Sequence, residues 1–393
     1  MLENKDLCCG CSACLHVCPK HSITFEENRE GFSYPKVNLR TCIECGLCEK
    51  VCPILSQNTA RVPFQIYAAK HRDNEVRLNS SSGGVFTLLA ENILRDGGVV
   101  FGARFNEKWE VIHDFTESKD SLAPFRGSKY VQSNIGNTYT IAERFLKSGR
   151  QVMFTGTPCQ ISGLKKYLRK DYDNLLTVDF VCHGVPSPMV WRKYLEDILF
   201  QSKAKKRTVF PSDSVDSTLT SVNFRDKSTG WKKYSVTFGF SKDLPDGIKK
   251  TMLSSVYTED SYMTAFLSNL SLRPSCYSCQ VKASRSGADI TIGDFWGSER
   301  IESDFDDDIG VSVVFINNLD ASKYLLNTDF IYKEVNYDQA IDMNKAMVSS
   351  SPVHPMRGLF MDTIRLLGFR KSFFLSTNSN FFIRILRRLY RTI

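Results

Sequence analysis

Cysteines provide the strongest chemical signal in this sequence. There are 13 of them in 393 residues, and eight form two copies of one pattern near the N-terminus, Cys-x2-Cys-x2-Cys-x3-Cys-Pro. The first copy consists of Cys8, Cys11, Cys14 and Cys18. The second copy consists of Cys42, Cys45, Cys48 and Cys52. Two complete copies of such a spacing rarely arise by chance, so the pattern indicates a site that needs all eight thiolates.

This spacing is typical of bacterial two-cluster ferredoxins, in which three close thiolates bind one 4Fe–4S cluster and the fourth binds the other cluster. The expected ligand sets are Cys8, Cys11, Cys14 and Cys52 for one cluster, and Cys42, Cys45, Cys48 and Cys18 for the second. Gly10 and Gly46 lie inside the ligand loops, where the backbone must pass close to inorganic sulfide. A zinc ribbon would need two ligand pairs with a longer spacer, which neither copy shows. A disulfide framework is disfavoured because no secretory signal precedes the cysteines.

The remaining cysteines suggest a third metal site. We take Cys9 as a bystander beside a ligand, which leaves Cys159, Cys182, Cys276 and Cys279. Four thiolates from three loops would bind a further 4Fe–4S cluster or a zinc ion. The alternative is that two of them are small buried hydrophobic residues and the Cys-x2-Cys pair is incidental. We favour the cluster because all-thiolate sites select soft metals and iron–sulfur clusters.

The elements that must position these cysteines alternate between strand and helix. Apolar strands are predicted at 66–69, 99–103, 151–154, 175–181, 288–292 and 311–316, and helices at 85–94, 138–146 and around 164–168. Such alternation predicts an α/β domain with a mainly parallel sheet, and residues 221–240 predict a β-hairpin insertion. Ligands of parallel sheets bind beyond the carboxyl ends of the strands, where Cys159 and Cys182 lie.

We therefore expect an α+β ferredoxin-like two-cluster module followed by an α/β domain. The predicted boundaries are 1–58 for the module, 59–345 for the α/β domain with parts at 63–140 and 145–300, and 346–393 for a basic C-terminal tail.

Two polar loops could bind phosphate. Residues 79–84 are rich in serine and glycine and open a predicted helix, whose free backbone donors and dipole would attract an anion. Residues 126–133 place an arginine and a lysine beside hydroxyl groups. The alternatives are a helix cap for the first loop and a solvated turn for the second.

The charge is concentrated at the C-terminus. The net charge is +8, and residues 365–393 contribute +7 of it without a single acidic residue. The last segment, 380–393, mixes arginines with apolar residues and could lie on an anionic membrane surface, on the acidic loop at 304–308, or on a partner. The body has no basic patch interleaved with aromatics, so we expect no nucleic-acid partner. Without a signal peptide or a long apolar run, a reducing cytoplasm is the expected setting.

Several segments carry a resemblance to a known family. They are 81–87, 127–130, 156–160, 182–186 and Cys276-x2-Cys279 with 289–297. In this order, from about residue 5 to about residue 300, the chain resembles the family of coenzyme F420 hydrogenase/dehydrogenase beta subunits. The sequences of residues 182–186 and 293–297 are most similar to those of bacterial members encoded among polysaccharide biosynthesis genes. The substrate of these members is unknown.

The resemblance implies a domain in which FAD exchanges hydride with a substrate and single electrons with iron–sulfur centres. It implies that FAD contacts come from Ser82, Gly83, Gly84, Ser128, Lys129, Gly156 and Thr157. It also implies a cluster beside the flavin on the four cysteines from Cys159 to Cys279. His183, Asp294 and Trp296 are candidates for positions near the flavin, with no acid or base role assigned.

We therefore predict an iron–sulfur flavoprotein oxidoreductase. Electrons would pass between a ferredoxin-like carrier, the clusters and FAD, and an organic substrate would be reduced or oxidised. One alternative is a non-catalytic relay subunit that serves a partner enzyme. Another is a cluster-bearing redox sensor without flavin.

Overall fold

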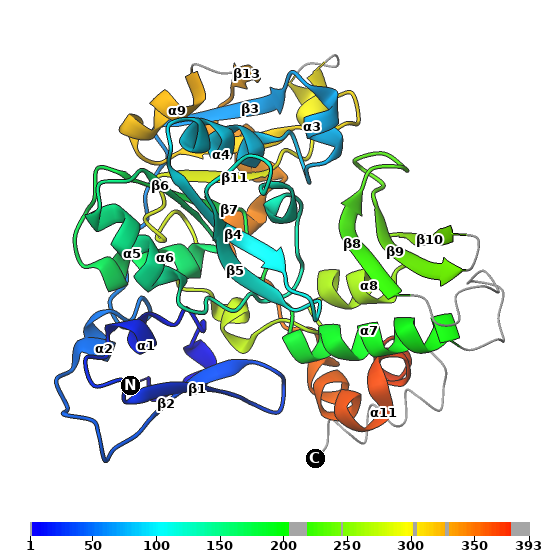
Figure 1. The fold of residues 1–393 in the computed structure, drawn as a ribbon, viewed down its shortest axis with the longest axis horizontal. Coiled ribbons are helices and arrows are strands. Elements are labelled where there is room, and N and C mark those ends of the chain that lie inside the picture. The colour runs from blue at the N-terminus through cyan, green and yellow to red at the C-terminus, as the bar shows by residue number, and fades with distance from the viewer. Residues whose placement is uncertain (1, 204–217, 245–246, 302–304, 327–329, 379–393) are drawn as a thin grey trace.

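The structure, a computed structural model, describes residues 2–203, 218–244, 247–301, 305–326 and 330–378. Figure 1 shows a small N-terminal module, a large sheet with covering helices, and a smaller sheet near two long helices. The N-terminal module lies against the large sheet's helical layer, on the side of α5 and α6.

The N-terminal module consists of two short helices and a two-stranded antiparallel sheet. They are α1 (Ala13–Val17), α2 (Leu47–Lys50), β1 (Ile23–Glu27) and β2 (Ser33–Val37). Each helix follows the second cysteine of its copy, and the two copies have the same backbone conformation around that cysteine. The left-handed conformation occurs at Gly10 (φ 71°) and its equivalent Glu44 (φ 52°), and again at Ser12 (φ 65°) and Gly46 (φ 71°). Glu44 and Ser12 adopt this conformation although it costs a non-glycine residue about 1–2 kcal/mol. What the two copies have in common is therefore the loop conformation and not the glycine.

The α/β domain is built on a mixed sheet of eight strands in the order β13-β3-β12-β11-β7-β6-β4-β5. The strands are β3 (Gln65–His71), β4 (Val99–Phe105), β5 (Val111–Thr116), β6 (Val152–Thr155), β7 (Leu175–Phe180), β11 (Ile290–Asp294), β12 (Ser312–Ile316) and β13 (Phe330–Glu334). The expected α/β domain is confirmed. Its sheet is parallel only in the centre, from β11 through β7 and β6 to β4, and the ladders on both sides of this centre are antiparallel.

Helices cover both faces of this sheet. They are α3 (Asn74–Leu78), α4 (Val85–Arg95), α5 (Thr138–Lys147), α6 (Pro158–Leu168), α9 (Lys323–Leu326) and α10 (Tyr337–Asp342). Neighbouring strand residues point to opposite faces, so Val100 and Met153 pack with α4 while Phe101 packs with α5 and α6. The N-terminal module contributes Cys9, Cys11 and other residues to the core of the α5–α6 face. The module and the α/β domain therefore share one hydrophobic core.

A second sheet contains the expected hairpin and one further strand. It consists of β8 (Thr218–Asp226), β9 (Ser235–Leu244) and β10 (Gly247–Val256), all antiparallel. Beside it lie α7 (Pro188–Lys203), α8 (Ser261–Leu267) and α11 (Arg357–Thr377). The helix α11 falls inside the segment expected to be a basic tail, yet it buries Phe360 and Ile364 and contacts α7. Residues 379–393, with the arginine-rich end, lie outside the described residues. No helix within the described ranges is long and apolar enough to cross a bilayer.

Candidate iron–sulfur sites and rim loops

The first expected ligand set comes together in one pocket. Cys8, Cys11, Cys14 and Cys52 all line it, together with Cys9 and Cys48. We call this the first cysteine pocket. Burial raises the pKa of the Cys14 thiol to about 12, so this thiolate would need a positive partner such as a metal centre. The structure thus brings the fourth cysteine of the second copy to the triplet of the first copy, as the spacing predicts.

The second expected ligand set is much less enclosed. Cys45 is exposed, and Cys42, Cys48 and Cys18 are partly exposed. The Cys18 thiol accepts a hydrogen bond from the Ser22 N–H at 3.3 Å. Burial opposes ionisation of this thiol, but hydrogen bonds from nearby backbone groups outweigh it and lower the pKa of Cys18. Cys42, Cys45 and Cys18 line neither the first cysteine pocket nor the pocket of the third set.

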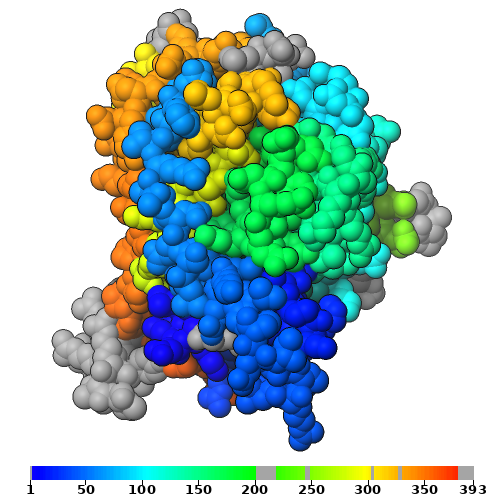
Figure 2. Space-filling view, turned by 90° about the vertical axis from the view of Figure 1, so that its left-hand side faces the viewer, coloured from blue at the N-terminus to red at the C-terminus, as the bar shows by residue number. Residues whose placement is uncertain are grey.

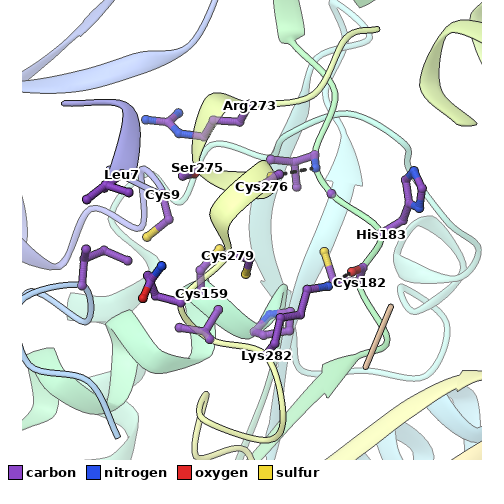
Figure 3. A pocket seen from close by; sticks show the side chains of 16 residues that line it. Leu7, Cys9, Cys159, Cys182, His183, Arg273, Ser275, Cys276, Cys279 and Lys282 are labelled. Atoms are coloured by element: carbon purple, nitrogen blue, oxygen red, sulfur yellow. Dashed lines mark hydrogen bonds between the residues drawn. The ribbon is translucent and has the colours of Figure 1, made fainter. Parts of the chain in front are cut away.

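The third expected ligand set also lines a single pocket (Figure 3). Cys159 is the second residue of α6, which follows β6, and Cys182 follows β7. Cys276 and Cys279 lie in and just after a short helical turn, Pro274–Ser278. Cys9, taken from the sequence as a bystander, is a fifth cysteine in this pocket. We call it the rim cysteine pocket, because it lies at the carboxyl ends of β6 and β7. Cys9 and Ile54 line both pockets, so the two pockets adjoin.

Two buried cations border the rim cysteine pocket. Arg273 is 1% exposed and Lys282 is 7% exposed. The Lys282 ammonium donates to the carbonyl oxygens of Cys182 and Ala346. Within the described part of the chain, neither cation pairs with a carboxylate. A 4Fe–4S cluster with four thiolates is anionic, so these cations fit a cluster in this pocket.

A single metal ion would require a tighter arrangement of ligands than these pockets provide. Among the described residues, no three His, Cys, Asp or Glu side chains converge closely enough to hold one ion. The thiolates of a cluster bind separate irons and stand further apart than the ligands of one ion. The cysteine composition of the two pockets therefore fits 4Fe–4S clusters.

The candidates for positions near a flavin are held in different ways. His183 lines the rim cysteine pocket, and its Nε2 lies 2.6 Å from Oδ1 of Asn269. Asp294 forms an ion pair with Arg225 through both of its oxygens, at 2.9 and 3.2 Å. Trp296 stacks on Trp231 with 4.8 Å between ring centroids. Asp294 is therefore engaged as a counter-ion.

The Ser/Gly loop is bound to its own chain. The Ser82 hydroxyl donates to the Val311 carbonyl at 2.7 Å, and the Gly83 N–H donates to the Ser312 hydroxyl at 2.9 Å. A Cβ at Gly83 would lie 2.3 Å from the Ala69 carbonyl oxygen, so close packing against the end of β3 explains this glycine. Gly84 has φ 90° and precedes α4.

The other two loops are also engaged internally. The Ser128 N–H donates to the Ser81 hydroxyl at 2.7 Å, which joins the Ser/Gly loop to the loop at 126–133. The Lys129 ammonium donates to two carbonyl oxygens, and burial lowers the pKa of Lys129 to about 7. The N–H of Gly156 donates to Val178, and that of Thr157 donates to Gln160. The residues expected to bind FAD thus lie near the rim, but the polar atoms named here bond within the chain, so their fit to FAD is poor.

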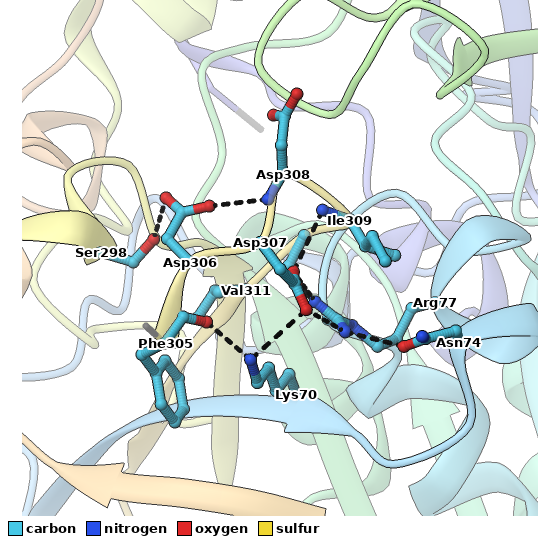
Figure 4. Close-up of polar contacts among 12 residues, drawn as sticks. Lys70, Asn74, Arg77, Ser298, Phe305, Asp306, Asp307, Asp308, Ile309 and Val311 are labelled. Atoms are coloured by element: carbon cyan, nitrogen blue, oxygen red, sulfur yellow. Dashed lines mark hydrogen bonds and ion pairs between the residues drawn. The ribbon is translucent and has the colours of Figure 1, made fainter. Parts of the chain in front are cut away.

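The acidic loop after β11 is held against β3 and α3 (Figure 4). Arg77 forms a two-pronged ion pair with Asp307, which also contacts Lys70 at 3.4 Å. Burial opposes the charge of Asp307, but the hydrogen bond from Arg77 outweighs it and lowers the pKa of Asp307 to about 2. The Asp306 carboxylate pairs with Lys232 at 3.0 Å. The part of this loop that the structure describes therefore uses its carboxylates within the chain.

The structure reveals a supporting network that the sequence analysis missed. Gln132 donates to the Cys9 carbonyl at 3.1 Å and accepts from Arg273 at 3.0 Å. Ser133, the next residue, contacts both His113 and Gln160 at 2.9 Å. The loop at 126–133 therefore connects the N-terminal module to the loop that carries Cys159. These residues stand alone in the sequence, without a spacing pattern that could have found them.

Comparisons with known proteins agree with this architecture. Two models of the family described as coenzyme F420 hydrogenase/dehydrogenase, beta subunit, match the chain. The model of the N-terminal part matches residues 66–138, and the model of the C-terminal part matches residues 149–329. A 4Fe–4S dicluster domain matches residues 7–54. These matches define the chain as an iron–sulfur protein of an oxidoreductase-subunit type. More specifically, it belongs to the family of coenzyme F420 hydrogenase/dehydrogenase beta subunits.

Individual relatives match parts of the chain. A coenzyme F420-dependent sulfite reductase of Methanocaldococcus jannaschii is 26% identical over 49% of this chain and 30% of its own length. One component of the F420H2 dehydrogenase of Methanosarcina mazei is 26% identical over 39% of this chain and 46% of its own length. The chain thus matches less than half of either relative. A solved F420-reducing [NiFe] hydrogenase complex from Methanosarcina barkeri contains a similar chain, with 17% identity, a TM-score of 0.46, and coverage of 72% of this chain and 87% of that one.

Proposed function

We propose that this chain is an iron–sulfur flavoprotein oxidoreductase that passes electrons between a ferredoxin-like carrier and a small organic substrate. The observation that carries the proposal is the contact between the two cysteine pockets. One pocket lies in the N-terminal module, the other lies at the rim of the sheet, and Cys9 and Ile54 line both. A path of thiol-lined sites therefore leads from Cys48 of the second copy, which lines the first cysteine pocket, to the rim.

The groups that such sites hold would supply the redox chemistry. Bound 4Fe–4S clusters transfer single electrons, and bound FAD exchanges single electrons for hydride. The eight N-terminal cysteines would hold two clusters, and Cys159, Cys182, Cys276 and Cys279 would hold a third. A reducing cytoplasm would keep all 13 thiols available, and all 13 are free in the structure.

The place of FAD in the proposal rests on the family resemblance and on the position of three loops. Ser82 to Gly84, Ser128 with Lys129, and Gly156 with Thr157 follow the sheet's carboxyl edge or lie beside it. The backbone N–H groups at the start of α4 would suit a phosphate group, whereas the Lys129 ammonium would first have to leave its two carbonyl partners. The substrate is either coenzyme F420, as the names of the relatives suggest, or another small organic molecule.

A relay subunit is the second candidate function. It is favoured by the internal hydrogen bonds of Ser82, Gly83 and Thr157, which leave these atoms engaged within the chain. It is also favoured by the relative in Methanosarcina mazei, which is named as one subunit of a dehydrogenase. In this case the rim cluster would pass electrons to a partner enzyme rather than to a flavin.

Quantitation of cofactors in anaerobically purified protein tests both candidates. About twelve irons with matching acid-labile sulfide and one FAD per chain would support the flavoprotein, because each cubic cluster holds four irons. About twelve irons without flavin would support the relay subunit. About eight irons in both the wild type and Cys279→Ser would refute the rim cluster. The flavoprotein should also reduce a dye with reduced ferredoxin or reduced F420 as donor, assayed in parallel.

A further inference from the structure

Arg273 occupies the boundary between the two cysteine pockets. It lines the rim cysteine pocket, where its segment continues directly to Cys276. On the other side its Nε donates to the carbonyl oxygen of Cys8 at 2.6 Å. A Cβ placed on Gly10 would lie 2.8 Å from Nη1 of Arg273, so the guanidinium also fills the space beside the first cysteine loop. One cation thus touches the walls of both pockets.

The environment of this cation lacks a negative partner of its own. The other donors of Arg273 reach the amide oxygen of Gln132 and the Ser33 carbonyl, both at 3.0 Å. Its guanidinium carbon lies 4.3 Å from the centre of the Tyr34 ring. In the described ranges no carboxylate pairs with it, although it is 1% exposed. A buried cation without a counter-ion is costly, so the site favours negative charge in the adjoining pockets.

We propose that Arg273 is a shared counter-ion that raises the reduction potentials of both the first cluster and the rim cluster. The inference rests on the proposed function, because it requires a cluster in each pocket. Each reduction adds one electron, and hence one negative charge, to a cluster, while the guanidinium stays protonated and breaks no bond. Net charge and nearby hydrogen bonds are established determinants of cluster potentials. A cation at the boundary favours the reduced form on either side and keeps the two potentials close.

Lys282 provides a matched control within the same fold. It is also a buried cation without a carboxylate partner among the described residues, and it donates to the Cys182 carbonyl. It lines the rim cysteine pocket but not the first cysteine pocket. Removing its charge should therefore affect the rim cluster alone.

Potentiometric titration followed by electron paramagnetic resonance tests the proposal on the holoprotein. In Arg273→Gln both the first and the rim cluster should shift to lower potential, and the cluster of the exposed triplet should not move. In Lys282→Gln only the rim cluster should shift. In Gln132→Leu, which removes a neutral partner of Arg273, the potentials should stay near those of the wild type. Cysteine variants that remove one cluster at a time assign each signal.

Arg273→Lys distinguishes the effect of the positive charge from that of the guanidinium geometry. It tests the proposal even if Arg273→Gln fails to retain iron. Lysine keeps the cation but loses the planar fork, so both potentials should remain near the wild-type values. A fall of both potentials in Arg273→Lys, or unchanged potentials in an iron-replete Arg273→Gln, would overturn the proposal. If the wild type itself lacks one of the two clusters, the proposed function fails first, which iron quantitation reveals independently.

Discussion

Two cysteine triplets with the same spacing and the same backbone have opposite surroundings in this protein. The inner triplet, Cys8, Cys11 and Cys14, lies just before and in α1, which contacts α5 and α6, and its Cys11 belongs to the core shared with the α/β domain. The outer triplet, Cys42, Cys45 and Cys48, lies at the surface, and α2 within it buries no residue. Figure 2 shows the N-terminal part of the chain, in blue, at the surface below the rest of the molecule.

Their glycines show the contrast at the level of atoms. Gly10 of the first copy is closely surrounded by Arg273 and Gln132, whereas Gly46 of the second copy has no atom within 4 Å of an added Cβ. Identical spacing therefore fixes the local loop but not its role. The inner triplet lies beside the rim cysteine pocket, and under the proposed function the outer triplet is where an external electron carrier would approach.

Replacing one cysteine in each triplet should give the largest difference. Cys11 is buried beneath α6, so Cys11→Ser should lose about four irons and lower the stability of the apoprotein by about 1–3 kcal/mol. Cys45→Ser should also lose about four irons, but change apoprotein stability by less than about 0.5 kcal/mol. Iron quantitation and urea unfolding measure both effects. Equal destabilisation by the two variants would abolish the distinction between the triplets.

The docking of the module can be tested through two ion pairs of its β-hairpin. Glu30 accepts two hydrogen bonds from Arg357, at 2.9 and 2.6 Å, across to α11. Glu30→Gln should cost about 1.5–3 kcal/mol, because it weakens a charge-assisted pair at a partly buried contact. Glu26 pairs with Lys36 in the same hairpin, with both side chains more than half exposed. Glu26→Gln should change the free energy of unfolding by less than about 0.5 kcal/mol.

Glycine substitutions should separate the triplets by iron loss from the first cluster rather than by the free energy of unfolding. Gly163 in α6 would place a Cβ 2.7 Å from the Cβ of Cys11, so Gly163→Ala should cost about 1–3 kcal/mol by overpacking, reduced by about 1 kcal/mol of helix propensity. Its signature is a weakened first cluster, seen as faster iron loss to a chelator. Gly46→Ala should cost about 1 kcal/mol from its left-handed backbone and leave the rate of iron loss from the first cluster unchanged. Unchanged or slower iron loss in Gly163→Ala would contradict the packing argument.

Acid should destabilise the folded protein through the buried His113, with the smallest of these effects. Burial lowers the pKa of His113, which lies under the loop of Gly156, to about 4. The unfolded chain protonates near pH 6.5 and the folded chain does not, so stability is lost as the pH falls from about 6.5 towards 4. At pH 5.5 the loss is about 1.4 kcal/mol. His113→Gln should flatten this part of a stability–pH curve, and an unchanged slope would exclude His113 as its source.

The sequence predicts most of what depends on local spacing. It correctly anticipates the gathering of Cys52 with the inner triplet, the alternation of strands and helices, and the hairpin of β8 and β9. It does not indicate β10, whose polar Lys249 and Lys250 hide the strand pattern. The arginines of α11 similarly hide a buried face that includes Phe360 and Ile364.

Long-range contacts are what the sequence could not supply. Arg273 meets Cys8 across 265 residues, and no periodicity links the two positions. Cys9 looks incidental because it stands beside a ligand, and only the approach of α6 shows that it lines two pockets. Such contacts depend on how the module docks, which is decided by shape and burial over the whole core.

The openness of the outer triplet also bears on damage and repair. An exposed cluster is the one that oxygen would reach first. Because α2 buries no residue and packs against the shared core through the partly buried Leu47, loss of the outer cluster would disturb that core little. The vacated thiols would remain reachable by an assembly factor, so the surface cluster could be rebuilt on the folded protein. The outer triplet would thus hold the cluster that is most easily lost and replaced, while the inner cysteines stay enclosed.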